Sequence, residues 1–526
     1  MAKSGSTRTT GARVTVPEPR ASRKGSSRTT ATDGGARPAP PPSLDERVQR
    51  GREARRQLPP EQIGQVDLSD RADPVDILQR QGAKRLPELV PVRYGRMLAT
   101  PFAFLRGAAA VMAADLATAP VSGLVVQACG DAHLANFGAY AAPDRRLVFD
   151  LNDFDETHPG PWEWDLLRLA ASFEMAGRER GLSRKERKRA VRAVAARYRE
   201  AMAAFAGQGN LAVWYARIDV EDIRTLMADK VSAQRRKAFD KSIAKARSRN
   251  SLRALGKLTE LVDGHRRFHT DPPLLVPISD LLPDLARDEL QDRLRGLLAG
   301  YRSTLQRDRR ALLIGYEYVD LARKVVGVGS VGTRCWVTLL RGRDDDDPLV
   351  LQIKEAERSV LAPHVPAPML AALPPELQAP DHQGERVVAG QHLMQAASDV
   401  FLGWERTAGI DGVERDFYVR QLHDQKGSAD VEGMNAEGLV LYAQMCAWTL
   451  ARAHARSGDR VAIAADLGAV GGSGDGRPYG PLHDEDDGFV DAVVRFAVDY
   501  ADRTEQDHDL LARAAQSGRV PVETGL

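Results

Sequence analysis

The sequence predicts an α+β protein with a large helical lobe and a smaller, sheet-rich lobe. The chain is mostly helical and highly charged over residues 183–312, whereas residues 318–428 are rich in β-branched and aromatic residues interrupted by glycines. A chain of 526 residues is also too long for one ordinary core. We therefore expect a helical lobe at 60–317, a sheet-rich lobe at 318–428, and helices at 429–526 that return to the helical lobe.

Residues 1–59 are predicted to form a disordered, basic tail. The first 44 residues are dominated by Ser, Thr, Arg, Gly and Pro and end in "ARPAPPPS", a composition that cannot bury enough apolar surface to fold. The segment has no apolar signal-peptide core. An arginine-rich tail poor in acidic residues can mimic a transit peptide or bind an acidic partner, but a solvated tail is the simpler interpretation.

The overall composition argues against several classes of protein. The formal net charge is +2, so no global charge field points to nucleic acid or a membrane, and the basic stretch at 235–255 lacks the interleaved aromatics of a nucleic-acid patch. Cys129, Cys335 and Cys446 are too far apart for a zinc motif or a disulfide framework. No apolar run is long enough to span a bilayer. We expect a cytoplasmic protein without a specific nucleic-acid or membrane partner.

A polar loop follows the first strand-like segment, "GLVVQACGD". The stretch "GDAHLANFG" places Asp131 and Asn136 five positions apart, so that both can face one site from a tight loop. An aspartate can accept the proton of a hydroxyl nucleophile, and an asparagine oxygen can bind a divalent cation. Mg²⁺ prefers such oxygen ligands, usually together with phosphate. The alternative is that these residues only cap turns.

A second strand-like segment, "RRLVFDLNDFD", supplies further carboxylates. Leu147, Phe149, Leu151 and Asp153 fall on one face of a strand, which places Asp153 at the rim of the predicted site. Asp153 is the expected metal-binding carboxylate, with Asp155 close by.

These motifs resemble those of a known enzyme group. "GDAHLANFG" is similar to the catalytic loop of aminoglycoside phosphotransferases and related protein-kinase-like enzymes, "NDFDE" resembles their metal motif, and "GPWEWDLLRLA" resembles a following segment with a buried aspartate. The interval of twelve positions from Asp153 to Asp165 also matches. More broadly, the chain resembles the bacterial family known as domain of unknown function 2252 from about residue 60 to its end, which implies no established activity.

The kinase-like resemblance implies a role for each matching residue. Asp131 corresponds to the catalytic base, His133 to a positioning histidine, and Asp165 to the aspartate that braces the loop. Asn136 and Asp153 correspond to the metal ligands. The chain departs from the pattern at Cys129, where these enzymes usually carry a histidine.

The sheet-rich segment contains a candidate nucleotide site. "GVGSVGTR" places Gly327, Gly329 and Gly332 in G-x-G-x-x-G spacing between two strand-like runs, and the next strand ends at Lys354 in "LVLQIK", which resembles the strand lysine of kinases. Glycines let backbone amides approach phosphate, and lysine adds a point charge. The alternative is a glycine-bearing hairpin with a surface lysine. A dinucleotide-binding turn is excluded because strand-like "CWVTLL" follows Gly332.

The order of the motifs predicts a permuted kinase-like fold. The catalytic loop precedes the glycine loop by roughly 200 residues, and "LARAHARSGD" near residue 455 resembles the helix that usually precedes a catalytic loop. In a phosphate-clamping arrangement the Lys354 ammonium lies within roughly 10 Å of the Asp153 carboxylate. Glu357 and Glu385 are both candidates for the glutamate that pairs with Lys354.

The predicted function is that of an ATP- and Mg²⁺-dependent phosphotransferase acting on a hydroxyl of a small molecule. Two alternatives stay open. The same residues could transfer a nucleotidyl group, or the fold could serve as a non-catalytic nucleotide- or ligand-binding pseudokinase. The sequence identifies neither the acceptor nor the oligomeric state.

Overall fold

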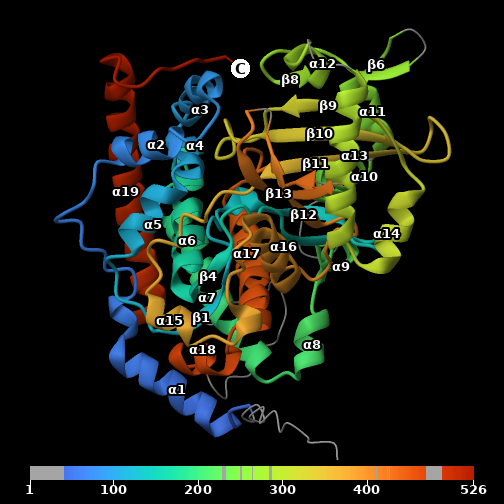
Figure 1. Ribbon diagram of the computed structural model, residues 1–526. Helices are drawn as coiled ribbons and strands as arrows, with labels where there is room; N and C mark the ends of the chain where they lie inside the picture. Colours follow the sequence, from blue (N-terminus) through green and yellow to red (C-terminus); the bar gives the residue numbers. More distant parts are fainter. Residues whose placement is uncertain are drawn as a thin grey trace, which may run out of the picture. The chain divides into compact units, whose positions relative to one another are not determined.

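The structure, a computed structural model, has mixed α and β architecture with several antiparallel sheets (Figure 1). This confirms the predicted α+β class. The residues that the structure describes are 41–227, 233–248, 251–262, 265–283, 287–409, 411–422, 425, 427–469 and 488–525. Contacts join Ser43–Leu526 into one compact unit.

The α-helices of the described residues are α1 (Leu44–Gln57), α2 (Pro74–Gly82), α3 (Val90–Met97), α4 (Pro101–Gly107), α5 (Ala109–Leu116), α6 (Trp162–Glu179), α7 (Arg184–Ala206), α8 (Asn210–Tyr215), α9 (Val220–Met227), α10 (Ala233–Arg247), α11 (Ser251–Leu258), α12 (Ile278–Leu281), α13 (Arg287–Thr304), α14 (Arg307–Ile314), α15 (Ala367–Ala371), α16 (Gln383–Met394), α17 (Ala436–Ser457), α18 (Arg460–Asp466) and α19 (Gly488–Gln516). The strands are β1 (Val125–Ala128), β2 (Phe137–Ala141), β3 (Leu147–Leu151), β4 (His158–Pro161), β5 (Ile218–Asp219), β6 (Thr259–Val262), β7 (His265–Phe268), β8 (Leu275–Pro277), β9 (Glu317–Lys324), β10 (Cys335–Arg341), β11 (Pro348–Glu355), β12 (Gly403–Ala408), β13 (Glu414–Gln421) and β14 (Gly427–Ser428).

Helix α1 lies inside the segment 1–59 that composition predicts as a tail, so that prediction is wrong for residues 44–57. Ser43 and Glu46 form a reciprocal capping box that starts the helix. Gly51 then lets α1 approach α18 closely, because a Cβ at this position would lie 2.1 Å from the backbone oxygen of Ala462. The charged composition of the segment gives no indication of this contact, so the helix is not predicted from composition. Residues 1–40 lie outside the described residues.

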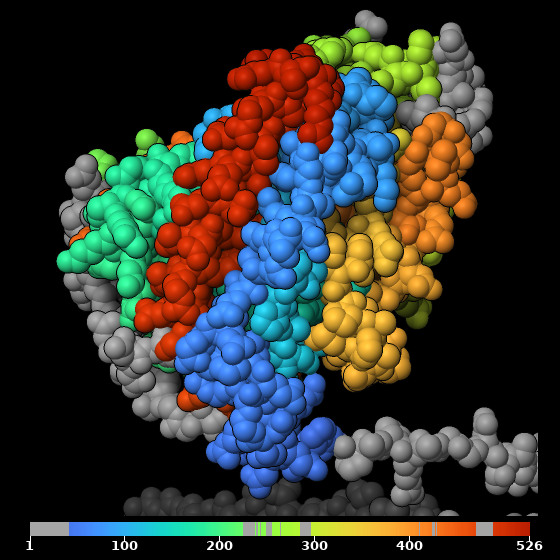
Figure 2. Space-filling view, turned by 90° about the vertical axis from the view of Figure 1, so that its left-hand side faces the viewer, coloured from blue at the N-terminus to red at the C-terminus, as the bar shows by residue number. Residues whose placement is uncertain are grey.

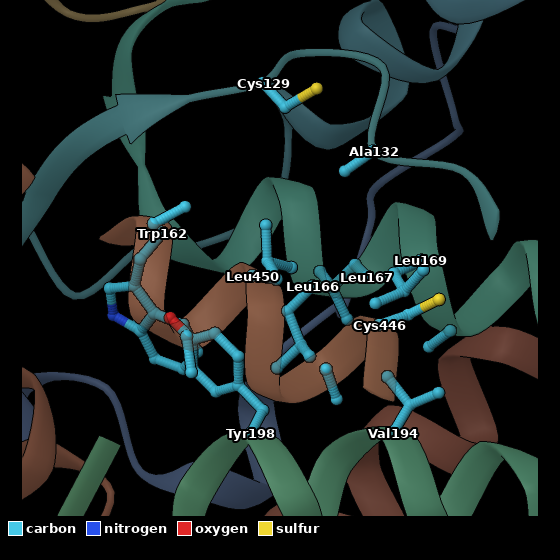
Figure 3. Packing of buried hydrophobic residues seen from close by; sticks show 14 of the residues in the cluster. Cys129, Ala132, Trp162, Leu166, Leu167, Leu169, Val194, Tyr198, Cys446 and Leu450 are labelled. Carbon is cyan, nitrogen blue, oxygen red and sulfur yellow. The ribbon is translucent and has the colours of Figure 1, made fainter. Parts of the chain in front are cut away.

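Helices from both ends of the chain share the largest apolar core (Figure 3). Trp162 at the start of α6 stacks on Tyr198 of α7, with ring centroids 5.5 Å apart and planes at 11°. Leu450 of α17 lies in the same cluster. The predicted apolar face of α6 is entirely buried, and its residues are Leu166, Leu169, Ala170 and Phe173. The segments before and after the sheet-rich region therefore fold together around α6.

The sheet-rich region forms a six-stranded antiparallel sheet in the order β12-β13-β11-β10-β9-β8. Lys354 lies on β11, between β10 and β13, and the glycine segment connects β9 to β10. Strand β8 belongs to this sheet although it precedes residue 318. The predicted boundary misses it because a strand of three residues is too short for a periodic pattern.

Two smaller sheets present the polar motifs. Strand β1 pairs with β4 and leads into the loop that carries Asp131, while β2 and β3 form a hairpin in the sheet β14-β2-β3-β5. Every residue of β3 is buried, so the period of two predicted for this strand does not separate a buried face from an exposed one. The buried Asp150 instead forms an ion pair with Arg452 of α17.

Helix α19 runs along the N-terminal helical segment (Figure 2). Arg71 joins the two by an ion pair to Asp115 at 2.7 Å and another to Asp507 at 2.6 Å. Among the described residues, no helix combines the length and the apolar character needed to cross a membrane.

Glu163 makes the stability of the helical core depend on pH. Its side chain is buried, one carboxylate oxygen accepts a 2.8 Å hydrogen bond from the Ser122 amide, and the other has no partner among the described residues. Burial raises the pKa of Glu163 from its ordinary value of 4.5 to about 7. The folded state therefore binds a proton more readily than the unfolded state between these values, and stability falls as pH rises through this window.

We expect Glu163→Gln to remove this pH dependence. The free energy of unfolding of the variant should rise relative to that of the native protein by about 3 kcal/mol between pH 5 and pH 8, at about 1.4 kcal/mol per pH unit across the window. Urea titrations at several pH values measure the difference. Parallel stability profiles for the two proteins would contradict the assignment.

Candidate functional site

Asp165 braces the loop that carries Asp131. It is buried at the start of α6, where its two carboxylate oxygens accept hydrogen bonds from the backbone amides of Cys129 at 2.6 Å and Gly130 at 2.9 Å. Gly130 has a φ of 80°, and a Cβ there would lie 2.2 Å from the backbone oxygen of Glu156. The loop is therefore fixed by a charge-assisted brace and by a turn that requires glycine. Asp165 holds the loop of Asp131 in place but is not among the residues that line the neighbouring cleft.

The end of helix α17 closes against the same loop. His454 places Nε2 3.2 Å from Asp165, and Ser457 Oγ accepts a 3.1 Å hydrogen bond from the amide of Gln127 on β1. The segment "LARAHARSGD" thus lies directly beside the strand that leads into the loop of Asp131, although 330 positions separate Gln127 from Ser457.

Asp131 lies at the mouth of this loop and is held by Arg168. The Arg168 guanidinium donates to Oδ1 of Asp131 from Nε at 2.5 Å and contacts the same oxygen through Nη2. Nε2 of His133 is 3.7 Å from Oδ2 of Asp131. Burial lowers the pKa of His133 to about 3, and nearby arginines act in the same direction although Asp131 opposes them. At such a pKa the imidazole of His133 is in its neutral form at pH 7.

Lys354 joins the six-stranded sheet to the segment after β3. Its side chain is 2% exposed, and Nζ lies 3.6 Å from Oδ1 of Asp153 and 2.5 Å from Oδ2 of Asp155. The predicted closeness of Lys354 and Asp153 is confirmed. Burial lowers the pKa of Lys354, but the two carboxylates outweigh burial and hold the pKa well above its usual value. The two carboxylates therefore favour the charged form of the lysine.

Asp155 forms the ion pair with Lys354 that was predicted for a glutamate. No ion pair of Lys354 with Glu357 or Glu385 occurs in the described structure. Asp155 instead receives Lys354 and the hydroxyl of Tyr418 at 2.5 Å. Burial raises its pKa, but the Lys354 charge dominates and lowers the pKa to about 2.

The segment "NDFDE" (residues 152–156), the metal-type motif, contains two aspartates that differ in their contacts. Both oxygens of Asp155 are engaged, since Ser330 Oγ of the glycine loop also donates to it at 3.0 Å. The metal role predicted for Asp155 is therefore not favoured by its contacts. Oδ1 of Asp153 has no hydrogen-bond partner among the described residues. Asn136 donates through Nδ2 to the backbone oxygen of Asp131 at 2.7 Å, which leaves its own side-chain oxygen for other partners.

Asn136 and Asp153 could together hold Mg²⁺. No cluster of three or more His, Cys, Asp and Glu side chains suited to a metal is found in the part of the chain that is described. Mg²⁺ does not need one, because it is usually bound by one or two carboxylates together with phosphate oxygens and water. The donor set is therefore compatible with a nucleotide-bound ion rather than with a protein-only metal site.

The glycine loop, residues 325–334 between β9 and β10, lines the same cleft. Gly327 and Gly329 line it together with Asp131, Asn136 and Asp153. Gly332 does not line the cleft: its oxygen accepts a 2.8 Å hydrogen bond from the Leu86 amide, and its φ of 89° serves the turn.

The N-terminal helical segment holds this loop. Arg85 donates to the backbone oxygens of Gly329 at 2.7 Å and Val331 at 2.5 Å. The cleft measures about 100 Å³, below the roughly 300–1,000 Å³ of ordinary ligand pockets. A nucleotide would therefore have to displace the loop, beginning with the bond between Ser330 and Asp155.

Several residues of the site were missed by the sequence analysis. Arg168 lies three positions after Asp165 on one helix, a spacing that could have identified it as a neighbour. Tyr418, Arg85 and Arg106 carry no motif and are brought to the cleft only by tertiary packing.

Removing the buried ammonium should destabilise the protein. We expect Lys354→Met to lower the free energy of unfolding by roughly 2–4 kcal/mol, because Asp153 and Asp155 lose the ammonium with which both form ion pairs. This loss is smaller than the roughly 3–5 kcal/mol for breaking a fully buried pair. The reason is that the side chains of Asp153 and Asp155 are 35% and 27% exposed. Denaturant titration measures the loss.

The double variant Lys354→Met/Asp155→Asn is the control. It removes one stranded charge and should recover a measurable part of the loss. A double variant whose losses simply add would show that the pair does not interact.

A family model described as "Uncharacterized protein conserved in bacteria (DUF2252)" matches residues 85–514. The match includes the loop of Asp131 as well as the glycine segment and Lys354. Comparison with curated proteins gives no match, and comparison with solved structures gives none either.

Proposed function

The chain belongs to this family of uncharacterized bacterial proteins, and we propose that it is an ATP- and Mg²⁺-dependent phosphotransferase with a permuted, two-lobed kinase-like fold. One observation carries the proposal. Lys354, on the sheet beside the glycine loop, reaches Asp153 and Asp155 of the metal-type motif, although 199 positions separate it from Asp155. Lys354 and these two carboxylates, which are remote in sequence, therefore lie together, and the carboxylates line one cleft with the glycine loop.

The contacts of α17 support the permuted order. In the usual motif order this helix would lead directly into the catalytic loop, and here its last turn touches β1, which does lead into that loop. In the proposed permutation, a chain with the usual motif order would be continuous from the end of α17 to the start of β1. In this protein these two points are neighbours in space but are not joined in sequence. The described residues 41–124 then precede the loop as an N-terminal addition.

The proposed nucleotide lies between the glycine loop and the metal-type motif. Backbone amides near Gly327 and Gly329 would approach the phosphates, and Lys354 would exchange part of its contact with Asp155 for α/β-phosphate oxygens. Asn136 and Asp153 would hold Mg²⁺, which when bound neutralises charge on the β- and γ-phosphates.

The proposed chemistry is an in-line transfer to a hydroxyl of a small molecule. The acceptor oxygen forms a bond to the γ-phosphorus, the bond from that phosphorus to the β-bridging oxygen breaks, and ADP leaves with the electron pair. Asp131 accepts the proton of the hydroxyl. Arg168 fixes the Asp131 carboxylate in place, and the neutral His133 packs beside it.

Mass spectrometry of a metabolite mixture incubated with the protein, ATP and Mg²⁺ tests the reaction class. A product heavier by one phosphoryl group supports the proposal. A product heavier by a nucleotidyl group would assign nucleotidyl transfer instead, and bound but unreacted ATP would assign a non-catalytic binding protein.

We expect Mg²⁺ and ATP to stabilise the folded protein. Binding to the native state alone adds about 2.7 kcal/mol at a hundredfold excess over Kd, which a thermal melt detects. Asp153→Asn should reduce the Mg²⁺-dependent part of this shift. A melting temperature that does not respond to millimolar ATP and Mg²⁺ would contradict nucleotide binding at this site.

Replacing the proposed base should affect turnover rather than nucleotide binding. We expect Asp131→Asn to lower kcat by a factor of about 10² to 10⁴ while Kd for ATP changes little. Equal effects of Asp131→Asn and Asp153→Asn on both quantities would show that the two carboxylates do not have separate roles.

A further inference from the structure

Helix α4 brings an additional arginine to the cleft. Arg106, in the last turn of this helix, lines the cleft together with Asp131, Asp153 and Gly329. The helix lies outside every motif that the sequence analysis identified.

The backbone on both sides of Arg106 is fixed by buried arginines. Nη2 of Arg168 donates to the oxygen of Leu105 at 3.0 Å, and Nη2 of Arg93 donates to the oxygen of Gly107, also at 3.0 Å. Arg168 is the residue that holds Asp131, so one guanidinium sets the distance between the proposed base and α4. This end of the helix is therefore positioned as firmly as the catalytic-type loop.

The glycine loop meets the other side of the same residue. A Cβ at Gly329 would lie 3.3 Å from the backbone oxygen of Arg106. The backbone of Arg106 therefore lies against the glycine loop, and Arg106 lines the cleft that this loop shares with Asp131. The terminal phosphate of a nucleotide held by Gly329 would lie in this cleft.

Within the part of the chain that the structure describes, the guanidinium of Arg106 makes no hydrogen bond or ion pair, and its Nε is buried without a hydrogen-bond partner. Burial lowers the pKa of Arg106, while the carboxylates of Asp131 and Asp153 act in the opposite direction. Leaving such donors unpaired costs free energy. The neighbouring Arg85 and Arg168 differ, since both donate to protein oxygens.

We propose that Arg106 binds the γ-phosphate of the nucleotide and stabilises the charge of the phosphoryl group during transfer, an inference that rests on the proposed function. A planar guanidinium matches two phosphate oxygens in a way that an ammonium does not. It would complement Lys354, whose place on β11 suits the α/β-phosphates. An arginine supplied to the transferred group in this manner increases kcat by about 10³ to 10⁵ in phosphoryl-transfer enzymes.

Calorimetric titration of ATP and of ADP, each with Mg²⁺, tests the contact directly. We expect Arg106→Gln to weaken ATP binding about tenfold and to leave ADP binding unchanged, because only ATP carries the contacted group. Arg106→Lys should retain part of the preference. Arg80→Gln is the matched control, since Arg80 is exposed on α2 and does not line the cleft. An Arg106→Gln protein with the native ratio of ATP to ADP affinity would overturn the proposal.

Stability and turnover separate this inference from the proposed function. Arg106→Gln should melt close to the native temperature, because the described residues make no hydrogen bond or ion pair with the lost guanidinium and its buried Nε is unpaired. If the native protein transfers phosphate and Arg106→Gln does so at the same kcat, Arg106 has no such role although the function stands. If Arg106 sets the preference for ATP but no group is transferred, the phosphotransferase proposal fails and the γ-phosphate contact stands. A native protein that binds neither nucleotide overturns both.

Discussion

The buried ammonium of Lys354 is the constraint on which the site depends. A charge that is 2% exposed needs a nearby counter-charge, and among the described residues Lys354 forms its ion pairs with the segment after β3. Asp155 binds Lys354, and it also accepts hydrogen bonds from Tyr418 of the same sheet and from Ser330 of the glycine loop. Separating the sheet from the metal-type motif would break the ion pair of Lys354 with Asp155 and the hydrogen bonds that Asp155 accepts. The ion pair therefore makes one cleft from two remote parts of the chain.

A second set of contacts fixes the opposite wall. Asp165 holds the loop of Asp131 through two backbone amides, and Arg168, one turn later on α6, holds the Asp131 carboxylate. The same Arg168 extends to the end of α4. Helix α6 is held in place by its packing in the core shared with α7 and α17 (Figure 3). The orientation of Asp131 and Arg168 in the site thus depends on the packing of α6 in the apolar core.

The sequence predicts those parts of the site that depend on local chemistry. The α+β class, the strand before Lys354 and the closeness of Lys354 to Asp153 follow from residue type, spacing and motif resemblance. Helix α1 was missed because its stability comes from a close contact with α18 that composition does not reveal. The choice of Asp155 over a glutamate as the partner of Lys354, and the approach of Arg106, depend on tertiary packing between segments about 200 or more positions from one another or on helices without a motif. Short strands such as β8 give too few residues for a periodic pattern.

A crystal structure with a non-hydrolysable ATP analogue and Mn²⁺ tests most directly whether the two motifs form one nucleotide site. We expect an anomalous peak between the side-chain oxygens of Asn136 and Asp153, with Nζ of Lys354 on a phosphate oxygen and the glycine loop lifted away from Asp155. A nucleotide bound elsewhere on the chain, or a phosphate tail that contacts neither Lys354 nor the metal-type motif, would contradict the proposed site.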